Sequence, residues 1–88
     1  MAEYTHVETH VVSATTTPTY ADFGSPPLRR VYVHSTDANC HIDFDTSPDT
    51  STSFLLPADT VVEFNVNCNK VYLVMSSATS TVYVMGVR

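Results

Sequence analysis

Residues 61–87 read VVEFNVNCNKVYLVMSSATSTVYVMGV, three runs of apolar and β-branched residues separated by short polar breaks. A period of two places successive side chains on opposite faces of a β-strand. Residues 69–75 and 80–87 are apolar on both faces. Each of these strands therefore either lies at the centre of a sandwich or presents its second face to another subunit, and we expect the two to form the last hairpin.

The sequence before residue 61 continues the same pattern. Residues 29–35 (RRVYVHS) and 39–45 (NCHIDFD) alternate on either side of the turn STDAN and predict a second antiparallel hairpin. Residues 3–12 (EYTHVETHVV) predict a strand with one solvated face. Val and Thr occur 13 times each and Leu four times, which is typical of strands and not of helices.

We therefore expect one all-β domain over residues 1–88, an antiparallel β-sandwich or small barrel of six to eight strands. Residues 1–30 are expected to form an N-terminal strand and an extended arm, and residues 31–88 the β core. The predicted core consists of Val31, Val33, Cys40, Ile42, Phe44, Val62, Phe64, Val66, Val71, Leu73, Val82 and Val84.

The charge of the chain excludes several classes of partner. Its formal net charge is −5, with only Arg29, Arg30, Lys70 and Arg88 as fixed cations. A nucleic-acid or anionic-membrane ligand needs a basic face, so we expect neither. The opening MAEYTHVETH has no basic and apolar segments of the kind found in a Sec signal peptide, and no apolar run approaches the roughly 20 residues of a membrane span. We expect synthesis in a cytoplasm.

The sequence shows no catalytic or cofactor motif, and we expect the protein not to be an enzyme and to bind no cofactor. The chain has two glycines, which excludes a Gly-rich phosphate loop, and no nucleophile lies in a GxSxG context. Cys40 and Cys68 fall on inward positions, and we expect buried free thiols. The polar faces of residues 39–45 (His41, Asp43, Asp45) and of residues 3–12 (His6, His10) predict solvated surfaces, so no metal site is expected.

Residues 39–87 resemble small phage virion proteins of the head decoration, or cement, type. The resemblance rests on the strand CHIDFD, a Ser/Thr/Asp loop, the step FLLPAD, the strand VVEFNVN, a turn at CNK and the ending VYLVMSSATSTVYVMGV. It implies a protein on the outside of the capsid, assembled in the host cytoplasm, that stabilises the shell by bridging subunits of the major capsid protein. Alternatives are a small neck or tail component of the same virion, or a stand-alone carbohydrate-binding sandwich.

Two groups of residues are the candidate contacts for this role. The segment from Ala14 to Arg30 is rich in proline and carries possible capsid contacts at Tyr20, Phe23, Leu28, Arg29 and Arg30, unless its aromatic residues fold back onto the core. The second face of the last strand carries Tyr83, Met85 and Val87. An apolar patch of this kind predicts self-association, and we expect a homotrimer, or else a dimer.

Overall fold

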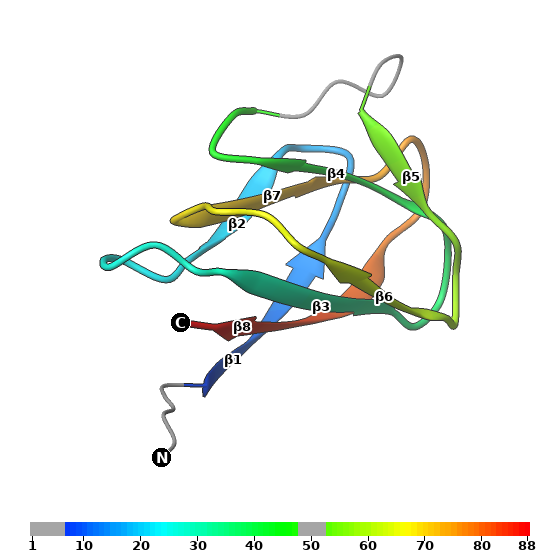
Figure 1. The fold of residues 1–88 in the computed structure, drawn as a ribbon. Helices are drawn as coiled ribbons and strands as arrows, with labels where there is room; N and C mark the ends of the chain where they lie inside the picture. The colour runs from blue at the N-terminus through cyan, green and yellow to red at the C-terminus, as the bar shows by residue number, and fades with distance from the viewer. Residues whose placement is uncertain (1–6, 48–52) are drawn as a thin grey trace.

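The computed structural model describes residues 7–47 and 53–88, which form two antiparallel four-stranded sheets packed face to face (Figure 1). The sheets have the strand orders β1-β8-β3-β6 and β2-β7-β4-β5. The prediction of an all-β antiparallel sandwich is thus confirmed. In chain order the strands are β1 (Val7–Ala14), β2 (Thr19–Asp22), β3 (Arg30–Ser35), β4 (Cys40–Phe44), β5 (Phe54–Leu56), β6 (Val61–Phe64), β7 (Lys70–Val74) and β8 (Ser80–Val87).

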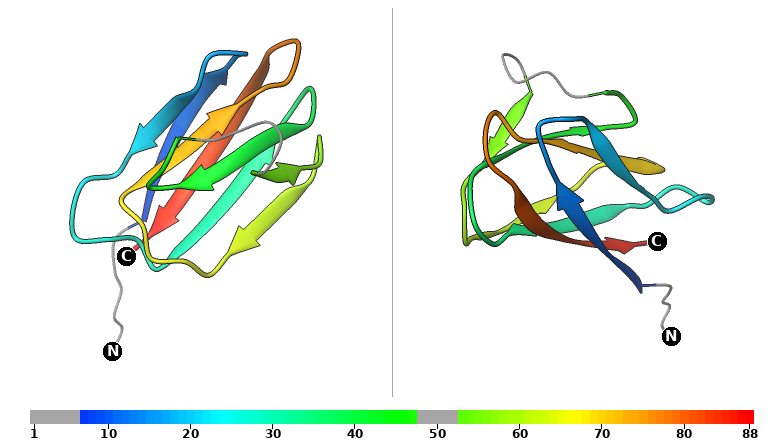
Figure 2. Two further views of the ribbon diagram at one scale, coloured as in Figure 1. Left: turned by 90° about the horizontal axis from the view of Figure 1, so that it is seen from above. Right: turned by 180° about the vertical axis from the view of Figure 1, so that it is seen from behind.

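The chain changes sheet at every connection except the one between β4 and β5 (Figure 2). Both predicted hairpins are therefore wrong. β3 pairs with β6 and β8, whereas β4 pairs with β5 and β7. β7 and β8 likewise belong to different sheets. The turns at residues 36–39 and 76–79 reverse the chain as expected but carry it across the core. A period of two shows which side chains face the core, not which sheet the strand joins.

The core lies between the two sheets and agrees closely with the prediction. Eight of the twelve predicted residues are at most 1% exposed: Val31, Val33, Cys40, Ile42, Val71, Leu73, Val82 and Val84. The other four, Phe44, Val62, Phe64 and Val66, are partly buried and pack against this cluster. β7 and β8 are both central strands of their sheets, which agrees with the first of the two explanations for their apolar sequences.

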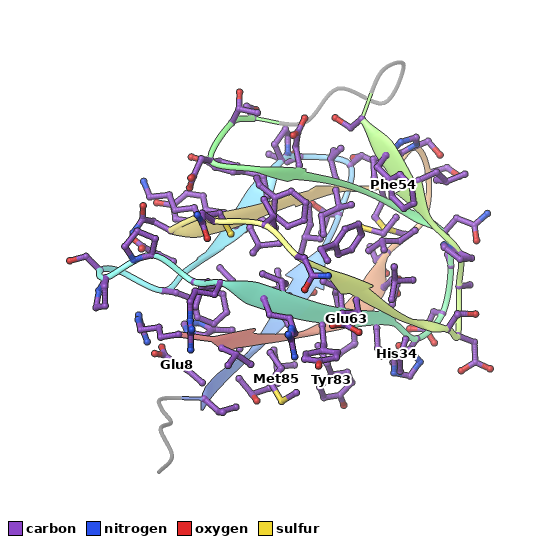
Figure 3. All side chains as sticks on the ribbon, in the orientation of Figure 1. Glu8, His34, Phe54, Glu63, Tyr83 and Met85 are labelled. Atoms are coloured by element: carbon purple, nitrogen blue, oxygen red, sulfur yellow. The ribbon has the colours of Figure 1, made fainter. Side chains whose placement is uncertain are left out.

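A cluster of aromatic rings lies at one side of the core, beside the edge strands β5 and β6. The ring of Phe64 lies 5.1 Å from that of Phe44 and 5.5 Å from that of Phe54, in edge-to-face arrangements that aromatic pairs favour. Phe54 nevertheless remains 56% exposed and is labelled in Figure 3. The core therefore ends at an open side where an aromatic ring still contacts solvent.

Residues 14–30 do not form a separate arm, which corrects the expected division of the chain. β1 pairs with β8, and β2 pairs with β7. Downstream of β2, Leu28 donates its backbone N–H to the carbonyl oxygen of Cys68 at 2.7 Å, and Phe23 donates to that of Asn69 at 2.9 Å. These bonds hold the proline-rich loop against the segment before β7, so the loop is part of the domain.

Gly86 allows this loop to pack against β8. A Cβ atom at Gly86 would lie 2.6 and 2.7 Å from the two Cδ atoms of Leu28 and 3.1 Å from Cε2 of Phe23. Real Cβ atoms essentially never show contacts below 3.0 Å. The missing side chain at residue 86 therefore provides the space into which Leu28 fits.

The loops that cross between the sheets are tied by buried hydroxyl groups. The Oγ atoms of Ser35 and Ser80 are 2.8 Å apart, and Ser35 Oγ donates to the carbonyl oxygen of Ala38 at 2.7 Å. The backbone N–H of Asp37 donates to Ser80 Oγ at 3.1 Å. Buried polar groups need such partners, and here they fix the path of residues 35–38 from β3 toward the other sheet.

Candidate interaction surfaces

The polar side chains predicted on residues 39–45 do not gather into one cluster. Within residues 7–47 and 53–88 there is no group of three His, Cys, Asp or Glu side chains arranged to hold a metal ion. His41 and Asp43 lie on the outward face of β4, but Asp45 lies in the following turn at φ 59°. Its carboxylate accepts the backbone N–H groups of Asn69 and Lys70 at 2.9 and 2.8 Å. Asp45 therefore stabilises the turn before β7.

The two cysteines are buried free thiols, as predicted. Burial raises the pKa of each thiol to about 11, and the carboxylate of Asp45 contributes to the shift at Cys68. The thiolate is the reactive form of cysteine, so a raised pKa disfavours nucleophilic chemistry. Cys40 and Cys68 behave as small core side chains.

The outward face of the sheet β1-β8-β3-β6, called here the β8 face, carries a cross-strand row of exposed side chains. Strand pairing places Val11, Tyr83, His34 and Val61 side by side across all four strands. Val11 is 62%, Tyr83 45% and Val61 64% exposed. Figure 3 shows Tyr83, Met85 and His34 on the side of this sheet that points away from the second sheet.

The rows beside it extend this surface along the strands. Thr9, Met85, Tyr32 and Glu63 form the next row, and Val7, Val87 and Arg30 the one after it. The charged groups of these two rows are paired, because Arg30 Nε lies 3.2 Å from a carboxylate oxygen of Glu63. The β8 face includes all three residues predicted for self-association, Tyr83, Met85 and Val87.

The outward face of the other sheet, called here the β7 face, carries a pair of tyrosines. Tyr20 on β2 pairs with Tyr72 on β7, and their ring centroids are 5.1 Å apart at an interplanar angle of 50°. Lys70 Nζ lies 5.0 Å from the centroid of the Tyr20 ring, within the range of a cation–π contact. Tyr20 is 48% exposed, as is expected of a contact residue.

The predicted capsid contacts do not form one surface. Phe23 is 4% exposed and Leu28 fully buried, so these two side chains fill the core of this domain and are not available to a partner. This corrects the prediction that they anchor a docking arm. Tyr20 lies on the β7 face, whereas Arg30 lies on the opposite β8 face. An apolar residue in a loop can serve either the core or a partner, and the sequence does not distinguish the two.

The arginines gather at one end of the sandwich. Arg29, Arg30 and Val87 line a shallow pocket of about 150 Å³. A guanidinium nitrogen of Arg29 donates to the backbone oxygen of Arg88 at 2.9 Å, and Arg30 Nε lies 3.2 Å from Asn65 Oδ1. Both predicted arginine contacts therefore lie at the surface, but neighbouring groups of this domain already occupy part of their hydrogen-bonding capacity.

A polar cluster at the same end was not predicted from the sequence. His10 Nε2 lies 2.6 Å from a carboxylate oxygen of Glu8, and the His10 ring lies 4.3 Å from that of Phe23. Arg88 contacts Glu8 at 3.4 Å and donates to the carbonyl oxygens of Pro26, at 2.9 Å, and Phe23. The hydrogen bond with His10, aided by Arg88, lowers the pKa of Glu8. His6, the other histidine predicted on this strand, lies outside the described residues.

Comparisons with protein-family models, with curated proteins and with solved structures find no match to this chain. These comparisons therefore show no family for the chain. The β8 face and the β7 face offer exposed apolar and aromatic side chains on two opposite sides of one small sandwich.

Proposed function

We propose that the protein is a phage head decoration protein, which binds the outside of the capsid and stabilises the shell by bridging its subunits. The observation that carries the proposal is the presence of exposed apolar side chains on both outward faces, Val11, Tyr83 and Val61 on the β8 face and Tyr20 and Leu55 on the β7 face. A bridging protein needs two contact surfaces that it can engage at once. The resemblance of residues 39–87 to decoration proteins points to the same role.

The proposed contact with the major capsid protein is the β7 face around Tyr20. Tyrosine is among the residues that contribute most to binding energy at interfaces, because it offers a large apolar area with a polar end. Tyr20 is backed by Tyr72 and lies beside Lys70, the only lysine of the chain. A surface with an exposed ring and an adjacent cation suits a partner that presents an apolar patch with a carboxylate at its rim.

An add-back experiment tests this contact with shells that lack the protein. We expect Tyr20→Ala to keep the thermal stability of the parent within a few degrees, because the ring is half exposed, and to bind shells at least about tenfold more weakly, as loss of an interface tyrosine typically does. Thr79→Ala, an exposed change in the loop between β7 and β8, is the control and should bind normally. Parental binding by Tyr20→Ala would contradict the proposed contact.

Copy number separates the proposed role from its nearest alternative. A decoration protein is present in hundreds of copies in a purified particle, whereas a neck or tail component is present in a dozen or fewer. Quantitative mass spectrometry of particles from the producing phage gives this number directly. Absence of the chain from purified particles would contradict both roles.

The tyrosine pair also favours a second candidate, a glycan-binding sandwich. Sugar rings stack on exposed aromatic side chains, and the structure brings together Tyr20 and Tyr72, which are far apart in the sequence. Against this role, the two rings are tilted by 50° and therefore do not form one flat platform. Binding on a glycan array that Tyr20→Ala abolishes would establish this function in place of the first.

A further inference from the structure

We propose that the β8 face binds a second copy of this chain, so that the protein is a two-fold dimer whose β1-β8-β3-β6 sheets pack face to face. This inference deepens the proposed function: a dimer joined through its β8 faces directs two β7 faces outward and can reach two capsid subunits. The pairing is a property of the isolated protein and is measured without shells.

The composition of the face is the first reason. The central row, Val11, Tyr83, His34 and Val61, crosses the whole sheet without a fixed charge. Within this row, His34 stacks on Tyr83 with ring centroids 6.4 Å apart. Three of its four members are apolar or aromatic and about half exposed or more. Contiguous exposed apolar surface of this kind marks a binding site on a protein that is otherwise polar.

The distribution of charge favours the β8 face over the other surfaces of this protein as the place where two copies meet. Each chain has a formal net charge of −5, so two copies repel one another except where their contact surfaces are neutral. On the β8 face Arg30 is paired with Glu63, and Asp59, which lies just before β6, is 3.4 Å from Nε2 of His34. Asp22 and Asp43 lie on the β7 face instead. The β8 face is thus the surface through which two like-charged copies can meet.

The strand order makes the face complementary to itself. A two-fold axis that lies in the interface and runs parallel to the strands places β1 of one copy over β6 of the other, and β8 over β3. Val11 then lies opposite Val61 of the second copy, and Met85 opposite Tyr32. Glu63 lies opposite Thr9 and so avoids a like charge. An axis perpendicular to the strands and through the central row would instead place each strand over its own copy, with Val11 opposite Val11 and Val61 opposite Val61, and the pair of variants described below distinguishes the two axes.

The area is sufficient for a reversible dimer. The four strands lie about 4.8 Å apart and have eight, eight, six and four residues at about 3.4 Å each, which gives a face of roughly 420 Å². Two such faces bury roughly 850 Å², in the range of weak, transient interfaces. We therefore expect a dissociation constant in the micromolar range, so that the dimer forms at high concentration and dissociates on dilution.

A pair of complementary variants tests the arrangement. Val11→Lys and Val61→Glu change side chains that are more than 60% exposed, so each should fold normally and each should weaken self-association at least about tenfold. When the two variants are mixed, the proposed axis places the new cation opposite the new anion at one contact and keeps Val11 opposite Val61 at the other. Sedimentation equilibrium should then show a heterodimer at least as tight as the parent dimer.

Leu55→Lys, which adds a charge on the opposite β7 face, is the matched control and should dimerise like the parent. A parent that remains monomeric at about 100 μM, far above the expected dissociation constant, would overturn the inference. A trimer, or a mixture of the two variants that stays monomeric, would also overturn it. Shell binding is measured separately, so a monomer that still binds shells refutes the dimer and leaves the proposed function standing.

Discussion

Replacing Gly86 by alanine introduces a methyl group into the space that Leu28 fills. The added Cβ would lie 2.6 and 2.7 Å from the Cδ atoms of Leu28, about 1 Å closer than an ordinary carbon contact. Leu28 is fully buried, so its side chain cannot turn toward solvent to make room. The other near neighbour, Phe23 at 3.1 Å, is also in the core.

The expected cost follows from two opposing effects. Overpacking a close-packed core costs about 1–3 kcal/mol. Replacing glycine by alanine restricts the unfolded chain and returns about 0.4–1 kcal/mol where the backbone accepts the side chain, as at a residue inside a strand. The free energy of unfolding should therefore fall by about 1–2 kcal/mol, which corresponds to a Tm lower by roughly 5–15 °C for a domain of this size.

Leu28→Ala provides the control through a double-mutant cycle. Alone, it should cost about 2–5 kcal/mol by leaving a cavity. Combined with Gly86→Ala, the new methyl group enters that cavity, so the double variant should be more stable than the sum of the two single changes predicts, by about 1 kcal/mol or more. Urea unfolding followed by circular dichroism, at one protein concentration, measures all four proteins. A Gly86→Ala variant as stable as the parent, or strictly additive changes, would refute the packing argument.

Three further changes have defined outcomes. The pKa of Glu8 is lowered in the folded state, so the stability that its carboxylate contributes is present above the ordinary pKa of 4.5 and is lost as the pH falls. Glu8→Gln should therefore make Tm depend less steeply on pH in this acidic range, which thermal unfolding at several pH values will measure. The pKa of both thiols is raised from 9.0 to about 11, so the stability that the protonated thiols contribute is present below pH 9 and is lost as the pH rises toward 11. The double change Cys40→Ala with Cys68→Ala should flatten this alkaline decline in Tm. Phe64→Ala should cost about 2–3 kcal/mol, somewhat less than a fully buried phenylalanine, because Phe64 is only partly buried; an unchanged urea midpoint would show that the aromatic cluster of the open side does not contribute.

The sequence was sufficient to predict which residues face inward in most of the strands. In β1 the prediction is wrong, because Val7 and Val11 point outward and His10, on the side predicted to be solvated, lies against the buried Phe23. Alternation in residues 29–35, 39–45 and 80–87 assigned Val33, Ile42 and Val84 to the core, where the structure has them. It was not sufficient to predict the pairing of strands. A strand in either sheet buries the same face, so two runs joined by a short turn read alike whether they pair or lie in opposite sheets.

The candidate surfaces were predicted unevenly for a related reason. The regular strand β8 contains Tyr83, Met85 and Val87. Because Val82 and Val84 of the same strand face inward, the alternation of side chains predicted that these three residues face outward. Phe23 and Leu28 lie in a loop without a period, where an apolar side chain carries no directional signal. Gly86 was the available clue, because a glycine inside a strand often marks the close approach of another segment.

The passage of the chain between sheets at nearly every connection has a consequence for how the protein folds. β8 joins β1 to β3, so the sheet β1-β8-β3-β6 cannot be completed until residues 80–87 are present, although β3 and β6 can pair earlier. Neighbouring strands in a sheet are mostly distant along the chain, and loop closure must precede the contacts that reward it. We expect slow, all-or-none folding that begins only after most of the chain has left the ribosome. Until then the apolar runs of β7 and β8 are exposed to aggregation, and chaperone binding during synthesis should be strongest for these segments.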